Sequence, residues 1–225
     1  MFFPVGSTIK PLRFPLVTII WILLCLGTYL FITRTELQKP LEETVTGAWA
    51  IIPAHSNAAW KFLGYQFFHS SLGHLISNVW YFAIFGWILE SLVGPVAFLV
   101  STVAAGAIAV LPEQIFQTNP NLPVVGASGA VAFSMGAVLA LRPESQIRFW
   151  LALIPMPHFP NTFMVPIRYL IYFWLLLQVS GLAMNQWVSP EPVAYATHLF
   201  GFGLGMLAAG LFSLTGTVVS IKETK

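Results

Sequence analysis

The sequence predicts an all-α membrane protein, a single domain built as a polytopic bundle of six transmembrane helices. Hydrophobic residues make up 57% of its 225 residues and charged residues only 8%, against about 25% charged residues in soluble proteins. The mean hydropathy is +0.79. Its few charges bound apolar stretches close to the length of about 20 residues with which a helix crosses a bilayer. The predicted spans are residues 15–32, 67–89, 95–111, 126–141, 166–182 and 192–214.

Three segments need separate interpretation. The first apolar run is expected to be a retained span, because no small-residue cleavage site of a signal peptide follows it. Residues 35–66 are mixed in polarity and carry tryptophans, which favours an outer loop partly embedded in the membrane interface. Residues 149–165 are apolar but broken by three prolines, so they are expected to form a loop with an interfacial piece. Counting that segment as a seventh span is the less favoured alternative.

The positions of lysine and arginine predict the orientation, because cytoplasmic loops carry an excess of both. With the N-terminus inside, the inner side holds Lys10, Arg13, Arg142, Arg148, Arg168, Lys222 and Lys225, and the outer side holds Arg34, Lys39 and Lys61. This predicts a multi-pass protein of the cell membrane with both termini in the cytoplasm. The second, fourth and sixth spans then begin at the outer face.

Polar side chains of reactive types lie near the predicted outer ends of these three spans. They are His69, His74, Asn78, Ser128 and His198. Reactive groups at membrane depth are costly, so they indicate a function. A serine and a histidine that enter the membrane from the same side suggest a hydrolase whose active site is open to the outer face.

Ser128 stands in the motif Gly126-Ala127-Ser128-Gly129. A serine at the first turn of a helix is most often an N-cap, and this alternative stays open. The flanking glycines permit a tight turn and the close approach of a substrate backbone. The free N–H groups of a helix N-terminus, including that of Ser128, can stabilise an oxyanion.

Small residues predict that the fourth and sixth spans pack together. Such faces let membrane helices approach closely, and the close approach would place His198 level with Ser128 as a general base. The two stripes are Ser128, Ala132, Gly136 and Ala140 on the fourth span, and Gly201, Gly205 and Ala209 on the sixth.

His74 and Asn78 are four residues apart and therefore share one helix face. They can serve as polar contacts between helices, but beside a serine nucleophile we interpret them as donors to an oxyanion. His69 is expected nearer the surface in a structural or substrate-lining role. Glu90, between Gly86 and Gly94, is expected at the inner end, where it would tie a helix end and lie too far from His198 to orient it.

Composition excludes several other kinds of chemistry. All eight acidic residues are glutamates, so a Ser-His-Asp triad is impossible and a Ser-His dyad is predicted. Glu191 is an unfavoured third member. No disulfide can form within the chain, whose one cysteine is Cys25. We predict no metal or cofactor, because the chain has no HExxH motif. The net charge of +2 does not indicate a nucleic-acid partner.

Five motifs in order resemble those of the rhomboid family of intramembrane serine proteases, of the six-span bacterial type. The resemblance covers about residues 60–205. Trp60-Lys61 resembles a Trp-Arg motif, and the segment from His69 through His74 to Asn78 is similar to the family's second span. The remaining three are Gly86, Glu90 and Gly94 as GxxxExxxG, residues 126–129 as GxSG, and His198, Gly201 and Gly205 as HxxGxxxG.

This resemblance implies a serine endopeptidase that cleaves transmembrane segments of single-span substrates in the lipid bilayer. Ser128 would be the nucleophile, His198 the base, and His74, Asn78 and the Ser128 N–H the oxyanion donors. The chain departs from the family at Lys61, which replaces arginine, and at Ala132, where members often carry an aromatic residue that stacks on the histidine. The alternatives are a non-catalytic rhomboid-like protein that binds membrane helices, and an unrelated transporter or channel.

Overall fold

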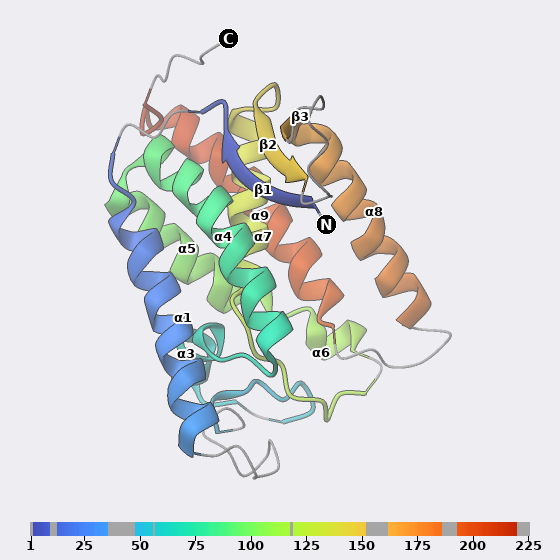
Figure 1. The fold of residues 1–225 in the computed structure, drawn as a ribbon. Helices are drawn as coiled ribbons and strands as arrows, with labels where there is room; N and C mark the ends of the chain where they lie inside the picture. Colours follow the sequence, from blue (N-terminus) through green and yellow to red (C-terminus); the bar gives the residue numbers. More distant parts are fainter. Residues whose placement is uncertain are drawn as a thin grey trace.

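A computed structural model describes residues 2–9, 13–35, 48–55, 57–117, 119–151, 162–185 and 193–219. The helices within these ranges are α1 (Leu16–Thr35), α3 (Ala59–Gly64), the 3-10 turn η2 (Tyr65–Phe67), α4 (Leu72–Val93), α5 (Pro95–Ala109), α6 (Glu113–Phe116), α7 (Ser128–Leu141), α8 (Ile167–Asn185) and α9 (Tyr195–Leu214) (Figure 1). Three short strands accompany them, β1 (Phe2–Ser7), β2 (Gln146–Leu151) and β3 (Thr162–Pro166). The predicted helical membrane bundle is confirmed.

In the described part of the chain, five helices are long and apolar enough to cross a membrane: α1, α4, α5 with its extension to Phe116, α8 and α9. The sixth predicted span corresponds to α7, which has only 14 residues. At a rise of 1.5 Å per residue it is about 21 Å long, against about 30 Å of hydrocarbon. The chain before α7 is buried from Val124 to Ala127, so the helix begins inside the protein.

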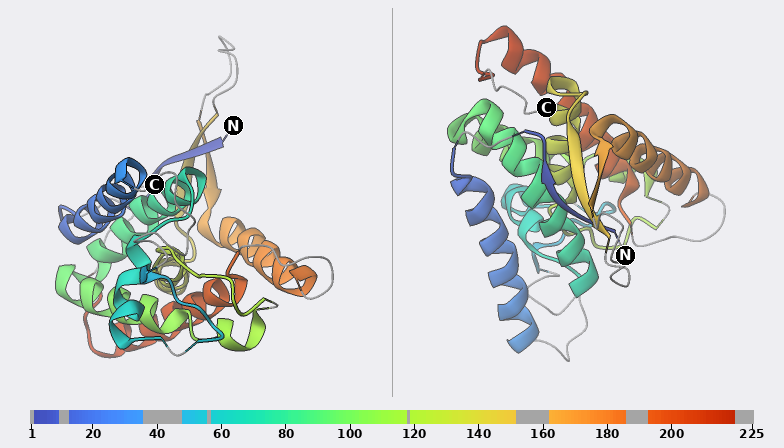
Figure 2. Two further views of the ribbon diagram at one scale, coloured as in Figure 1. Left: turned by 90° about the horizontal axis from the view of Figure 1, so that it is seen from below. Right: turned by 45° about the horizontal axis from the view of Figure 1, so that its top comes forward.

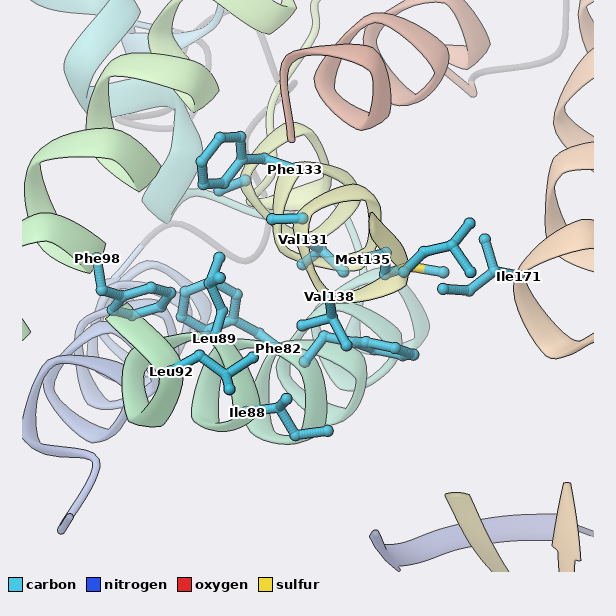
Figure 3. Close-up of a cluster of buried hydrophobic side chains, with 14 of the residues drawn as sticks. Phe82, Ile88, Leu89, Leu92, Phe98, Val131, Phe133, Met135, Val138 and Ile171 are labelled. Carbon is cyan, nitrogen blue, oxygen red and sulfur yellow. The ribbon is translucent and has the colours of Figure 1, made fainter. Parts of the chain in front are cut away.

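The short helix α7 is tolerated because other helices enclose it. The view from below shows α7 end-on near the centre, with α4, α5 and α9 around it (Figure 2). Every residue from Gly129 to Leu139 is buried. Val131, Met135 and Val138 belong to one buried apolar cluster with Phe82 and Leu89 of α4 and Ile171 of α8 (Figure 3).

Glycines allow α7 and α9 to pack backbone against backbone, as the small-residue stripes predict. A Cβ on Gly201 would lie 2.5 Å from the carbonyl oxygen of Gly129, and one on Gly205 or Gly136 would collide with the facing backbone. The closest approaches on α7 are at Gly129, Phe133 and Gly136. The line of contact thus runs one residue away from the predicted stripe at Ser128 and Ala132, which leaves the Ser128 side chain off the interface.

The prediction that residues 149–165 form a loop with an interfacial piece was wrong at both ends of the segment, where the described residues form strands. Strand β2 pairs antiparallel with β3 and with the N-terminal strand β1, in the order β1-β2-β3. The three prolines stand at 155, 157 and 160, outside the described residues and between the two strands, so they do not interrupt the pairing. The sheet lies between α4 and α8 (Figure 2).

The second span begins later than predicted, at Leu72 instead of residue 67. The η2 turn and an extended segment occupy residues 65–70, so His69 precedes the helix. Ser71 is the N-cap, and its hydroxyl accepts the N–H of His74 at 3.2 Å. An N-cap serine satisfies a donor that the first turn leaves free, which sets the start of α4 here.

At the other end of α4, Glu90 holds the start of α1. Its carboxylate accepts the N–H groups of Val17 and Thr18 at 3.0 and 2.8 Å and the Thr18 hydroxyl at 2.7 Å. Gly86 packs against Phe82 and Phe98, and Gly94, with φ of +82°, joins α4 directly to α5. The three residues of the GxxxExxxG pattern therefore organise the junction of α1, α4 and α5.

Candidate active site

A cavity of about 570 Å³ opens among α4, α7, α8 and the start of α9. Side chains predicted from distant parts of the sequence line it together: His74, Asn78, Ser128 and His198. Apolar and aromatic side chains also line it, including Tyr81, Val131, Met135 and Trp174. The structure thus places the proposed nucleophile, base and oxyanion donors around one space, without a hydrogen bond between Ser128 and His198.

Ser128 is the first residue of α7 and does not cap it. The N-cap position is Ala127, which has no side chain that could accept an N–H, and no side-chain cap is formed. The alternative of Ser128 as an N-cap is therefore wrong. Because its hydroxyl makes no hydrogen bond within the described residues, it is available to a molecule in the cavity.

Gly126 determines how closely α4 approaches this turn. Its φ is +123°, a backbone conformation that residues with a Cβ rarely adopt. A Cβ at this position would lie 2.8 Å from Nε2 of His74 and 3.8 Å from Nδ2 of Asn78. Only glycine brings these two side chains against the turn that precedes Ser128.

The segment between α1 and α4 supports the same turn. Ile51 and Val124 exchange backbone hydrogen bonds at 3.0 and 2.8 Å, and the N–H of Gly126 donates to the Tyr65 carbonyl at 3.0 Å. The Tyr65 hydroxyl donates to the Gly106 carbonyl at 2.6 Å. Burial, with a smaller contribution from Glu113, raises the pKa of Tyr65 above its usual range, so it remains a neutral donor.

Trp60 and Lys61 lie in α3, within the segment predicted as a loop. Trp60 packs edge-on against Trp49 with ring centroids 4.5 Å apart, and its side chain is exposed. Lys61 donates to the Ala50 carbonyl at 3.3 Å and lies 5.9 Å from the Trp60 ring. The lysine therefore makes one directed contact, where the fork of an arginine could make two.

His69 is a structural neighbour of His74 and does not line the cavity. The two rings meet edge to face, with centroids 5.1 Å apart. Burial, reinforced by His74, lowers the pKa of His69 to about 3, so the ring is neutral at physiological pH. His74 is held in turn by Ser70, whose Oγ lies 3.3 Å from Nδ1, and its carbonyl accepts Nδ2 of Asn78 at 2.9 Å.

His198 is steadied by residues that the sequence analysis missed. Its Nδ1 lies 2.7 Å from Oε1 of Gln178 on α8. The rings of Trp174 and Tyr195 lie 6.1 and 6.5 Å from the imidazole. Phe133, the residue after Ala132, belongs to the buried apolar cluster (Figure 3). The available signal was a glutamine one turn after a tryptophan in an otherwise apolar span.

Glu113 is a second residue that sequence reasoning used only as a span boundary. Its Oε1 accepts the N–H of Thr197 at 2.8 Å and the Thr197 hydroxyl at 3.1 Å. The side chain is buried, and α6, which carries it, lies beside the lower end of α9 (Figure 1). Glu113 therefore holds the residue next to His198 without touching the imidazole.

The described residues contain no group of three His, Cys, Asp or Glu side chains that could hold a metal ion. His69, His74 and His198 accordingly do not converge on one point. The cavity instead offers a hydroxyl, an imidazole and neutral donors, which is the chemistry of acyl transfer through a serine.

Comparison with known families agrees with this arrangement. A family model described as the rhomboid domain matches residues 56–215, more than two thirds of the chain and the whole of the cavity lining. Among curated proteins, no sequence matches the chain. The chain belongs to the rhomboid family.

Proposed function

We propose that the protein is an intramembrane serine endopeptidase that cleaves transmembrane segments of other membrane proteins. Members of the rhomboid family are usually enzymes of this kind. The observation that carries the proposal is the convergence of Ser128, His198, His74 and Asn78 on one cavity at the recessed start of α7. In the proposed mechanism Ser128 is the nucleophile, His198 is the general base, and His74 and Asn78 are donors to the oxyanion.

In the acylation step, Oγ of Ser128 attacks the scissile carbonyl carbon while Nε2 of His198 takes the hydroxyl proton. The carbonyl oxygen becomes an oxyanion, which accepts hydrogen bonds from His74, Asn78 and the Ser128 N–H at the positive end of α7. Collapse of the intermediate breaks the C–N bond, and the imidazolium gives its proton to the leaving amine. Water then repeats the sequence on the acyl-enzyme and releases the carboxylate.

The shape of the cavity supports a membrane segment as the substrate. The described residues that line it include no Lys, Arg, Asp or Glu, and Val131, Met135 and Trp174 give it an apolar wall. A helical substrate must unwind locally, because its carbonyls already accept hydrogen bonds within the helix. We therefore expect substrates with Gly, Pro or other helix-weakening residues near the outer membrane boundary.

The orientation is part of the same proposal. Arg13 lies beside Gly94, and Arg142 donates to the Val219 carbonyl, so cationic side chains gather at the end of the bundle away from Ser128. This supports a cell-membrane protein with both termini in the cytoplasm and a cavity that receives water from the outer face. The six-span count and the single-span substrates belong to this proposal as well.

The decisive experiment is cleavage of a labelled single-span substrate by the purified protein in liposomes. Wild type should release product, whereas Ser128→Ala and His198→Ala should fall to background. Ser134→Ala is the matched control, because Ser134 is a buried serine of the same helix that bonds only to the Ala130 carbonyl. Equal product from wild type and Ser128→Ala would refute the protease and leave the non-catalytic helix-binding protein as the better explanation.

A further inference from the structure

The imidazole of His198 is held from the neighbouring helix α8. Gln178 presents Oε1 to Nδ1 of His198 at 2.7 Å, and its side chain is 8% exposed. Trp174, one turn earlier on α8, lies 6.1 Å from the same ring at an angle of 35°. One helix therefore supplies both a polar and an aromatic contact to the imidazole.

The direction of the Gln178 amide identifies the tautomer of His198. Nε2 of Gln178 donates to the Trp174 carbonyl at 3.3 Å, so the oxygen is the end that faces the ring. An amide oxygen can only accept, hence Nδ1 of His198 must carry a proton. In the neutral imidazole, Nε2 is then the unprotonated nitrogen.

We propose that Gln178 is a positioning residue for His198. It holds the Nδ1–H tautomer and leaves Nε2 free to take the proton of Ser128, an inference that rests on the proposed function. Gln178 stands where the carboxylate of a Ser-His-Asp triad orients its histidine. A neutral amide does this without placing another charge at membrane depth, where charges are costly.

The acids of the described residues are engaged elsewhere. Glu90 binds the start of α1, Glu113 binds Thr197, and Glu144 pairs with Arg168. The chain has no aspartate. In the described part of the protein, the Gln178 oxygen is therefore the acceptor that Nδ1 of His198 uses.

The kinetic test compares Gln178→Met, which keeps the length of the side chain but loses the acceptor, with Gln178→Glu, which restores one. We expect kcat to fall about tenfold in Gln178→Met with KM unchanged, since one hydrogen bond is lost. Gln178→Glu should stay within about threefold of wild type. Leu177→Met, at an exposed neighbour on α8, is the control and should not change kcat. Equal losses in Gln178→Met and Gln178→Glu would reduce Gln178 to a packing residue.

A second readout does not depend on cleavage. The ¹⁵N spectrum of histidine-labelled protein, at mildly alkaline pH, distinguishes a protonated from an unprotonated ring nitrogen, and the His198 signal is assigned by its loss in His198→Ala. We expect Nε2 of wild type to be unprotonated and Gln178→Met to show both tautomers. A protonated Nε2 in wild type, or the same spectrum in Gln178→Met, would overturn the proposal. If wild type instead cleaves no better than Ser128→Ala, the protease function fails while the spectrum still decides the role of Gln178.

Discussion

Two buried glutamates hold helix N-termini at opposite ends of the bundle, by the same chemistry and with different consequences. Glu90 accepts two N–H groups and the Thr18 hydroxyl at the start of α1, and Glu113 accepts one N–H and the Thr197 hydroxyl at the start of α9. Free N–H groups and the helix dipole favour a carboxylate at both places. The Glu90 contact lies far from the cavity, whereas Thr197 is adjacent in sequence to His198.

The same contact between a carboxylate and a helix N-terminus therefore affects stability at both places, but it affects the position of a cavity side chain only at α9. Helix α1 carries none of the cavity residues, so its N-terminus only has to stay attached to α4 and α5. Helix α9 carries His198 in its first turn, where a small shift of the backbone moves the imidazole relative to Ser128. Two substitutions test this comparison, and a third tests a buried histidine at the same end of the bundle as Glu113.

The largest effect is expected for Glu113→Ala. It removes the acceptor from the Thr197 N–H and hydroxyl, and it should cost about 2–3 kcal/mol of unfolding free energy. If the protein is the proposed protease, kcat of the folded fraction should also fall about tenfold or more. The reason is that a small displacement of His198 relative to Ser128 lowers the rate steeply. Activity per folded molecule is measured beside a thermal melt. Glu113→Gln keeps an acceptor oxygen and is the control; a fully active Glu113→Ala would show that α9 is positioned by other contacts.

Glu90→Ala should match Glu113→Ala in stability and differ in activity. The loss of three hydrogen bonds at the start of α1 is expected to cost about 2–3 kcal/mol. The kcat of the protein that remains folded should stay within about twofold of wild type, since no cavity residue is touched. Melts and substrate cleavage on the same preparation provide both values. A kcat loss as large as in Glu113→Ala would mean that the two ends are coupled through α4.

The effect expected to be smallest at neutral pH is the acid sensitivity of the end of the bundle that carries His69. The pKa of His69 is about 3 in the folded protein and its ordinary value is 6.5, so between these values the unfolded state binds more protons. Stability is therefore full above pH 6.5 and falls as the pH drops toward 3, by at most about 1.4 kcal/mol per pH unit. His69→Phe should flatten the dependence of the melting temperature on pH in this window. His55→Phe, at an exposed histidine, is the control, and an unchanged slope in His69→Phe would assign the sensitivity to another group.

Much of the fold and of the site could be predicted from local patterns. Charges bounded the spans, and the order of the spans placed Ser128 and His198 at the same end although 70 residues separate them. Glu90 was recognisable because two glycines flank it at helical spacing. Gln178, Glu113 and Tyr65 were missed because each acts on a residue of another helix or loop, through a contact that has no spacing of its own.

Of the elements that were predicted wrongly from the sequence, the strands depend on contacts between distant residues. The prolines near residue 157 indicated a loop, yet the strands on either side pair with each other and with the N-terminal strand, because backbone pairing depends on partners distant in the sequence. The late start of α4 came from the Ser71 cap, a signal that was present but outweighed by the apolar run before it.

The amino-acid sequence was sufficient to predict a polytopic helical membrane protein and the motifs of its family, and to exclude an aspartate that could complete a triad. Composition and helical periodicity suffice for this prediction, because each span must satisfy its own backbone hydrogen bonds and expose apolar side chains to lipid. Three features were visible only after folding: the buried start of α7, the approach of His74 and Asn78 to Gly126, and the contacts of Gln178 with the His198 ring and of Glu113 with Thr197. These features depend on the distances between helices. Side-chain packing sets those distances, and they leave no pattern in the local sequence.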